Sequence, residues 1–326
     1  MPHKFNADRP DKIPKQKQQV TNCAEYDESL RQRGDLTVWI SDDALAVWSA
    51  PPRTTPGGQP VYSDLAIEMC LTLRMVFKRP LRQTQGLISS IAKLLGVDIT
   101  VPHFTTMSRR GNGLSLSAKT VPKSAKQPVQ LVVDSTGLKI FGEGEWLEKK
   151  HKTRRKRRSW RKLHLGLDFV SGQIVCSDLT TDDIGDPTAL PGLLDQIDAP
   201  VDLFLADGAY DGEPTVQVLN ERFGSAIKVT IPPPKNAIMS PNAAQNPSAR
   251  DRHIADIAAH GRMAWQTSSG YNQRSRIETQ IGRWKAVIGY KLKARSFKNQ
   301  KTEAKIGVRV LNRMTELGRP NFERTT

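Results

Sequence analysis

The sequence predicts an α/β protein in which a mixed β-sheet with flanking helices follows a helical N-terminal region. Apolar residues recur at helical spacing between residues 36 and 110, whereas short alternating or fully apolar runs begin at residue 129. In this second part, three strands come first and then strands and helices alternate, which is typical of a mixed sheet covered by helices. A chain of 326 residues is long enough for one large or two ordinary domains.

The chain is strongly basic. Its 49 Lys and Arg residues against 33 Asp and Glu give a formal net charge of +16, which favours a polyanionic partner such as nucleic acid. Its three cysteines form no CxxC pair, so neither a disulfide framework nor a zinc module is indicated. No apolar run is long enough to cross a membrane, and the polar start has no signal-peptide region, so we expect a cytoplasmic protein without a membrane partner.

The N-terminal part divides into a polar segment and a helical region. Residues 1–35 are polar and weakly patterned, and we interpret them as an N-terminal arm. Helical spacing starts near Asp35, and a Pro- and Gly-rich break follows at residues 51–60. Three further helices are expected, over residues 64–77, 81–95 and 102–110.

The last two of these helices flank a turn that contains Gly96, which resembles a helix-turn-helix. In that interpretation residues 36–122 form a DNA-binding region, and Arg109 and Arg110 face outward as candidate DNA contacts. Two packed helices without any role in reading DNA give the same pattern, so both interpretations stay open.

Residues 123–326 are expected to form the second domain. Residues 162–169 alternate with period two, and the short turn after them predicts a hairpin with the next strand. Strands are expected over residues 129–141, 162–169, 173–179, 201–206 and 227–231. Helices are expected over residues 187–197, 214–223, 250–258, 271–288 and 302–317.

Two aspartates directly follow apolar runs that are predicted to lie in buried strands. Asp134 follows the apolar residues 131–133, and Asp207 follows the apolar residues 203–206. Ligands of open α/β sheets gather at the carboxyl ends of strands, and paired carboxylates there would suit Mg²⁺ or Mn²⁺. Each aspartate alone could be a turn residue or a helix cap; the pair favours a metal site. Asp211 lies beyond the second strand, where a turn or cap role is favoured.

A third carboxylate lies on the helix predicted to begin at Tyr271. At about 100° per residue, Tyr271, Arg274, Glu278 and Lys285 share one face about 60° wide, beside an apolar stripe that can pack on the sheet. The pattern could be a solvated face with ion pairs. It also suits a site that grips a phosphate chain and contributes to a metal site.

These segments carry a family resemblance. Residues 271–285, YNQRSRIETQIGRWK, match the Y-(2)-R-(3)-E-(6)-K signature of insertion-sequence transposases of the IS4/IS5 type. Residues 131–138 (LVVDSTGL) and 204–212 (FLADGAYDG) resemble the family's two aspartate blocks. The resemblance is closest to the IS5 group and covers most of the chain from about residue 60 onward.

The resemblance implies a ribonuclease-H-like DDE transposase. Asp134, Asp207 and Glu278 would be its catalytic, metal-binding triad for two Mg²⁺ or Mn²⁺ ions, and Tyr271, Arg274 and Lys285 would lie near the DNA backbone. It further implies binding to the element's terminal inverted repeats, hydrolysis of DNA phosphodiesters and joining of the 3′-hydroxyl to target DNA. A homodimer on double-stranded DNA, associated with the bacterial nucleoid, is the expected form.

A basic run lies between the first two predicted strands. Residues 149–162 contain ten Lys or Arg and no acid, a density that repels itself unless a polyanion neutralises it. A solvated loop is the alternative. The candidate DNA contacts in this run are Arg154, Arg155, Lys156, Arg157 and Arg158.

Two other functions stay open. The chain could be a non-catalytic DNA-binding regulator derived from a transposase, or a ribonuclease-H-like nuclease without strand transfer. The three carboxylates favour an enzyme over the regulator. The helical N-terminal region and the Tyr, Arg and Lys of the signature favour transposition over simple nuclease activity.

Overall fold

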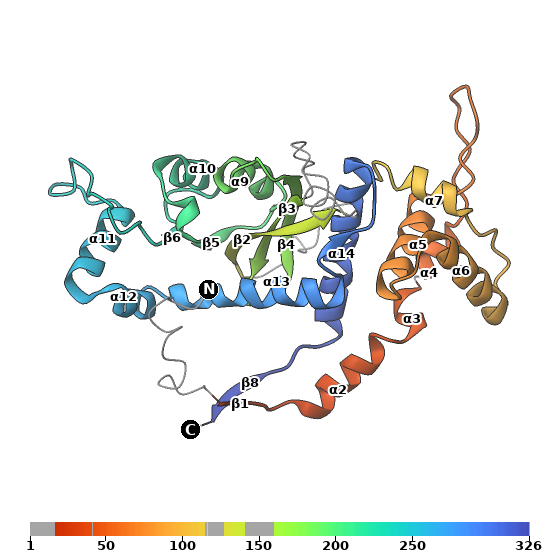
Figure 1. Cartoon of the computed structure of the whole chain (residues 1–326), viewed down its shortest axis with the longest axis horizontal. Helices are drawn as coiled ribbons and strands as arrows, with labels where there is room; N and C mark the ends of the chain where they lie inside the picture. Colours follow the sequence, from red (N-terminus) through yellow and green to blue (C-terminus); the bar gives the residue numbers. More distant parts are fainter. Residues whose placement is uncertain (1–16, 41, 115, 117–126, 141–159, 326) are drawn as a thin grey trace, which may run out of the picture. The chain divides into compact units, whose positions relative to one another are not determined.

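The computed structural model describes residues 17–40, 42–114, 116, 127–140 and 160–325 (Figure 1). The chain divides into two compact units, one made of residues 1–38 with 313–326 and the other of residues 39–312. The fold is mixed α/β, as the sequence predicts. Among the residues described, no helix combines the length and the apolar character needed to cross a bilayer.

The smaller unit joins segments from opposite ends of the sequence. Strand β1 (Lys17–Val20) pairs antiparallel with β8 (Phe322–Thr325). The Asn22 side chain donates to the Arg319 carbonyl at 2.9 Å and accepts from the Asn321 amide at 2.8 Å. Helix α2 (Cys23–Gln32) follows, inside the segment that we interpreted as an arm. The short helix α3 (Leu36–Trp39) comes next along the chain.

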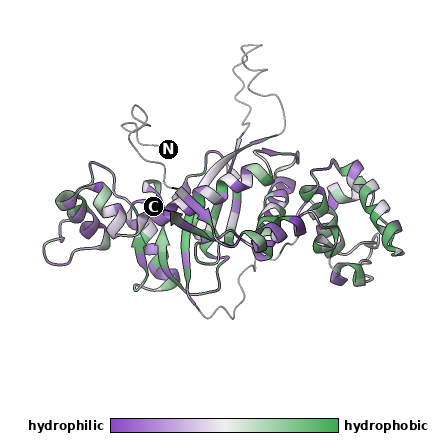
Figure 2. Ribbon diagram, turned by 90° about the horizontal axis from the view of Figure 1, so that it is seen from below, coloured by the Kyte–Doolittle hydropathy of each residue, from purple (hydrophilic) through white to green (hydrophobic). Residues whose placement is uncertain are grey.

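A group of helices begins the larger unit. It contains α4 (Asp42–Ala46), α5 (Asp64–Val76), α6 (Leu81–Leu95) and α7 (Phe104–Arg110). The Ser63 hydroxyl accepts from the Ala66 amide and so caps the start of α5. Gly96 ends α6 in the left-handed conformation, with φ of +65°, which costs glycine little. Green and purple residues mix along these helices, as in amphipathic helices (Figure 2).

The central sheet of the larger unit is mixed, and its described strands have the order β4-β3-β2-β5-β6. Strands β2 (Val129–Ile140), β3 (Trp160–Asp168) and β4 (Ile174–Thr181) are antiparallel neighbours. Strands β5 (Val201–Leu205) and β6 (Lys228–Thr230) extend the sheet in parallel to β2. A two-residue strand, β7 (Lys291–Leu292), pairs with the carboxyl end of β2 and was not predicted.

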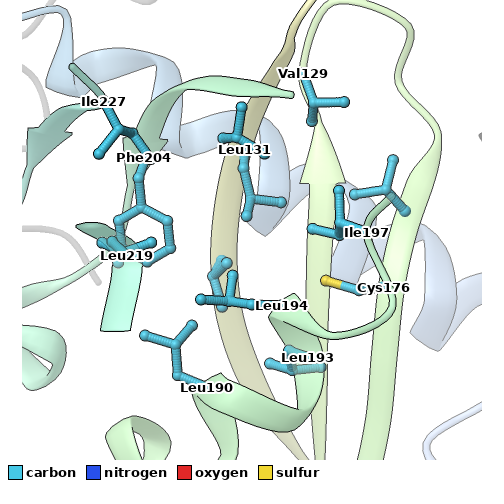
Figure 3. Close-up of a cluster of buried hydrophobic side chains, with 14 of the residues drawn as sticks. Val129, Leu131, Cys176, Leu190, Leu193, Leu194, Ile197, Phe204, Leu219 and Ile227 are labelled. Atoms are coloured by element: carbon cyan, nitrogen blue, oxygen red, sulfur yellow. The ribbon is translucent and has the colours of Figure 1, made fainter. Parts of the chain in front are cut away.

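Helices cover both faces of the sheet. On one face, Leu131 and Phe204 pack with helices α9 (Asp186–Leu194) and α10 (Glu213–Phe223) (Figure 3). The other face packs against α13 (Ser275–Val287) and α14 (Phe297–Leu317) through residues such as Val132 and Trp284. Side chains of a strand alternate between faces, so Asp134 lies on the α13 face and Ser135 on the α9 face.

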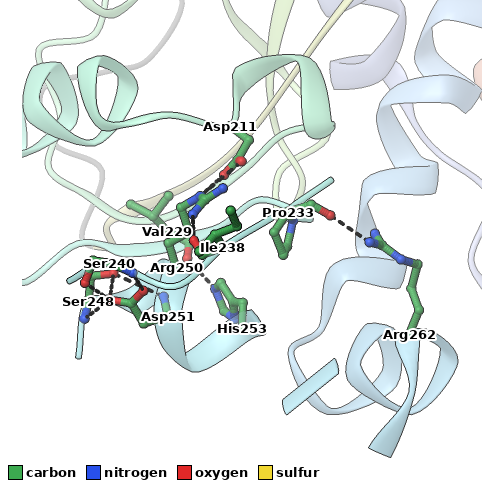
Figure 4. A network of polar contacts seen from close by, with 10 residues as sticks. All are labelled: Asp211, Val229, Pro233, Ile238, Ser240, Ser248, Arg250, Asp251, His253 and Arg262. Carbon is green, nitrogen blue, oxygen red and sulfur yellow. Dashed lines mark hydrogen bonds and ion pairs between the residues drawn. The ribbon is translucent and has the colours of Figure 1, made fainter. Parts of the chain in front are cut away.

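A helical insertion separates β6 from α13. It contains α11 (Ala249–His260) and α12 (Arg262–Ser268), the second of which was not predicted. Backbone and hydroxyl hydrogen bonds from Ser240 and Ser248 hold the pKa of Asp251 well below its usual range (Figure 4). Arg250 Nε donates to both carboxylate oxygens of Asp211, at 3.0 and 3.1 Å. Asp211 therefore ties this insertion to the loop after β5.

Candidate active site

Three predicted carboxylates meet between the sheet and α13. Asp134 is in the middle of β2, and Asp207 follows the neighbouring parallel strand β5. Asp207 caps the 3₁₀ turn η2 (Gly208–Tyr210) by accepting from the Ala209 amide at 3.0 Å. Glu278 lies in the first turn of α13. Adjacent parallel strands and one packed helix thus bring together residues that lie up to 144 positions apart in sequence.

One guanidinium lies among all three carboxylates. Arg274 Nη2 is 2.9 Å from Asp134 Oδ2 and 3.9 Å from Asp207 Oδ2, and Arg274 Nη1 is 2.6 Å from Glu278 Oε1. Arg274 ends the 3₁₀ turn η3 (Tyr271–Arg274), one turn before Glu278. The Nε atom of Arg274 is buried and has no hydrogen-bond partner among the described residues. The arginine is therefore held at this place mainly by the carboxylates.

The carboxylates differ in exposure. The Asp134 side chain is 14% exposed, against 36% for Asp207 and 49% for Glu278. Burial raises the pKa of Asp134; the Arg274 guanidinium and the Ser135 amide oppose this change, and the other two carboxylates add to it. The ionised form of Asp134 therefore depends on a nearby cation.

The donor set fits a hard divalent cation, although the described residues include no group of three His, Cys, Asp or Glu side chains converged as a metal site. The three side chains offer only carboxylate oxygens, the ligands that Mg²⁺ and Mn²⁺ prefer. Each of them instead faces the positive charge of Arg274. The arginine thus provides the compensation that a cation among these oxygens would otherwise provide.

The remaining signature residues take different positions. Tyr271 is half-buried, with its ring centroid 5.4 Å from that of Trp265, and burial raises the pKa of its hydroxyl. Lys285 is exposed near the end of α13, and the three carboxylates pair with Arg274 rather than with it. The helical spacing predicts the approach of Arg274 to Glu278, but it does not bring Lys285 into the same cluster.

A polar network that the sequence analysis missed lies behind Asp134, on the α9 face. Asp186 Oδ1 is 3.0 Å from Lys162 Nζ and 3.3 Å from His164 Nδ1, and His164 is fully buried. Burial works against ionisation of Asp186, but hydrogen bonds from His164, Lys162 and Ser135 lower its pKa to about 2. Ser135 follows Asp134 directly, so this network fixes the strand at the site. The only sign of this network in the sequence was a polar residue, His164, at an alternating position of a predicted strand.

The predicted DNA contacts outside the signature fall into three groups. Arg109 is exposed on α7. Arg110 is not free as expected, because it pairs with Asp64 at 2.6 Å and donates to the Tyr62 carbonyl at 2.9 Å. The predicted contacts in the basic run lie outside the described residues; they are Arg154, Arg155, Lys156, Arg157 and Arg158.

Two protein-family models match this chain, and both are described as "Transposase DDE domain". One matches residues 31–143 and the other matches residues 125–313. The second match covers more than half of the chain and includes Asp134, Asp207 and Glu278. The matches and the mixed sheet therefore agree with the fold that the sequence predicts.

Proposed function

Because the chain belongs to the family of transposase DDE domains, we propose that it cuts DNA at the ends of an insertion element and joins the freed 3′-hydroxyl to target DNA. The observation that supports this proposal is that the side chains of Asp134, Asp207 and Glu278 meet around the guanidinium of Arg274. We assign these three residues the catalytic and metal-binding roles. We further propose that the chain is of the IS5 type, as the signature at residues 271–285 suggests.

The proposed chemistry follows from the charge of the site. DDE transposases use divalent metal ions, and Asp134, Asp207 and Glu278 would hold them here. When bound, such ions supply Lewis-acid stabilisation to the attacking and leaving oxygens of a phosphodiester. The triad offers oxygen ligands from two strands and one helix, which keeps their spacing rigid.

Arg274 has a second role in this proposal. Its guanidinium can form bidentate hydrogen bonds with a phosphate, as it does with carboxylates. A scissile phosphate close to Asp134 would therefore find Arg274 as a ready partner, while Tyr271 lines the same end of α13. The exposed Lys285 and the basic run at residues 149–162 would add contacts to the DNA backbone.

The test compares the native chain with Glu278→Gln on a duplex that carries the inverted repeats flanking the gene. A matched control is Glu221→Gln, because Glu221 is exposed on α10, where it accepts a hydrogen bond from the Gln217 side chain. Cleavage and joining are followed with Mg²⁺, Mn²⁺ and EDTA, and binding is measured in parallel. We expect the native chain and the control to cleave and join, and Glu278→Gln to bind without doing either.

The other outcomes separate the alternatives. Binding without cleavage by the native chain in any metal would favour a DNA-binding regulator. Cleavage without joining would favour a nuclease. Full activity of Glu278→Gln would remove Glu278 from the triad. Pairing of two ends by a homodimer is part of the proposal, and a complex of one chain with one end in size-exclusion chromatography would contradict it.

A further inference from the structure

A second charged site lies in the larger unit, apart from the carboxylates. A cavity of about 650 Å³ opens between α7, the end of α5, the start of α6 and the segment 293–296 that precedes α14. The Asn299 side chain donates to the Ser108 carbonyl at 3.2 Å and so ties α14 to α7 beside this cavity. We call it the basic cleft, and its charged lining residues are Arg74, Arg82, Arg109, Lys293, Arg295 and Glu303.

The cations of the basic cleft lack acidic partners. Its one acid, Glu303, accepts from the backbone amides of Lys293 and Ala294 at 2.7–3.1 Å. Among the described residues, Arg74, Arg109 and Arg295 form no ion pair, and Arg74 Nε is buried without a hydrogen-bond partner. Five cations therefore face one carboxylate that the backbone already satisfies.

These cations also disfavour one another. Partial burial and the positive charge of Arg74 lower the pKa of Lys293, although Glu303 opposes this change. Arg82 lies over the Phe104 ring, which also lines the cleft, with its guanidinium carbon 4.8 Å from the ring centroid. Like charges that a fold holds together without a counter-charge are typical of an anion-binding site.

We propose that the basic cleft binds the phosphodiester backbone of an element-end duplex, away from the residues that cut it. This inference rests on the proposed function and extends it. Arginine matches phosphate in bidentate geometry, and four of the five cations here are arginines. The volume of the cleft exceeds that of one phosphate, and its cations are spread over several elements, which suits a run of backbone rather than a single anion.

The strand geometry gives the approximate distance between the basic cleft and Asp134. Lys139 is five residues beyond Asp134 on β2 and pairs in register with Lys291 of β7. Five residues of strand span about 17 Å, and Lys293 follows two residues later, so the cleft lies about 17–25 Å from Asp134. In this proposal the duplex runs from the carboxylates along β2, so at 3.4 Å per base pair it reaches the cleft about five to seven base pairs from the cut.

The test uses the full chain and a fluorescein-labelled duplex of about 30 base pairs that carries the flanking inverted repeat. The variant combines Arg109→Gln, Lys293→Gln and Arg295→Gln, which spares the half-buried Arg74. The matched control combines Lys93→Gln, Lys228→Gln and Arg313→Gln, three exposed cations that do not line this cleft. A charge-retaining variant, Arg109→Lys with Lys293→Arg and Arg295→Lys, separates charge from folding.

We expect the cleft variant to bind the duplex at least about tenfold more weakly at physiological salt. Its slope of log K against log salt should be shallower by about 2.7, since each lost phosphate contact removes about 0.9. Hydroxyl-radical footprinting should lose the protection five to seven base pairs from the cut and keep the protection at the cut. The control and the charge-retaining variant should keep the native slope.

Native affinity, slope and footprint in the cleft variant would overturn the assignment of the cleft while leaving the proposed function intact. If the charge-retaining variant also had a shallower slope of log K against log salt, the effect would be attributed to altered folding. That result would overturn the assignment of the cleft as well. Failure of the native chain to bind the duplex at all would instead refute the proposed function.

Discussion

The contact of Arg274 with three carboxylates predicts that this arginine competes with divalent metal in the absence of DNA. The perturbation is Arg274→Gln, which removes the guanidinium and its charge and keeps a shorter, polar side chain. Hydrogen bonds between charged groups each contribute about 1.5–3 kcal/mol, and the exposure of Asp207 and Glu278 screens their share. We therefore assign the three contacts together about 2–3 kcal/mol, which a bound metal ion would have to displace.

Two measurements follow from this magnitude. In isothermal titration of the DNA-free protein, Mn²⁺ should bind Arg274→Gln about 30- to 150-fold more tightly than the native chain, because 1.4 kcal/mol corresponds to a factor of ten. In EDTA the variant should melt about 3–5 °C lower, because its carboxylates have lost their cation, and added Mn²⁺ should reverse this difference.

Arg276→Gln is the matched control for this prediction. Arg276 lies on the same helix, donates to the Phe169 carbonyl at 2.9 Å and lies over the Phe169 ring, but it contacts none of the three carboxylates. Its substitution should leave Mn²⁺ affinity unchanged. The reasoning fails if Arg274→Gln binds Mn²⁺ no more tightly than the native chain and melts at the same temperature in EDTA.

Two further predictions concern stability. The pKa of Asp186 is lowered from its ordinary value of 3.8 to about 2, so ionised Asp186 stabilises the fold above about pH 4. As the pH falls toward 2, about 2 kcal/mol of the free energy of unfolding should be lost from the native chain but not from Asp186→Asn. Urea unfolding across this pH range tests this, and parallel pH profiles of the two proteins would contradict it. A Cβ atom at Gly307 would overlap the Trp284 ring, so Gly307→Ala should cost about 1–3 kcal/mol in urea unfolding. Gly282→Ala meets open space and should stabilise its helix by about 0.5–1 kcal/mol; a change of the same sign in both variants would refute this argument.

Most of the sheet could be predicted because its strands carry local signals. The alternating residues of β3 and the apolar run of β5 identify strands without any tertiary information. Strand β7 has only two residues, too few for any period to appear, and its pairing with β2 depends on a contact between distant segments. Helix α2 was missed because it is polar, so its sequence resembles that of an unstructured arm.

The sequence predicts which residues belong to the candidate site, but it does not predict the contacts between them. Helical spacing places Arg274 and Glu278 on one face, and the structure has them 2.6 Å apart. The predicted helix was expected to begin at Tyr271. In the structure Gly270 is in the left-handed conformation, residues 271–274 form a 3₁₀ turn, and the helix begins at Ser275. The pairing of Arg274 with Asp134 joins residues 140 positions apart, and no local pattern specifies such a contact. Whether the three carboxylates catalyse a reaction stays a prediction.

The pairing of β1 with β8 has a consequence for synthesis of the protein. Among the described residues, the strand that pairs with residues 17–20 is formed by residues 322–325, about 300 residues later in the chain. At about 5–20 residues per second, a ribosome needs roughly 15–60 s to make the intervening chain. During that time β1 has an unsatisfied backbone edge, which is a site for wrong pairing or for capture by a chaperone. The smaller unit can therefore be completed only after the larger one has been translated.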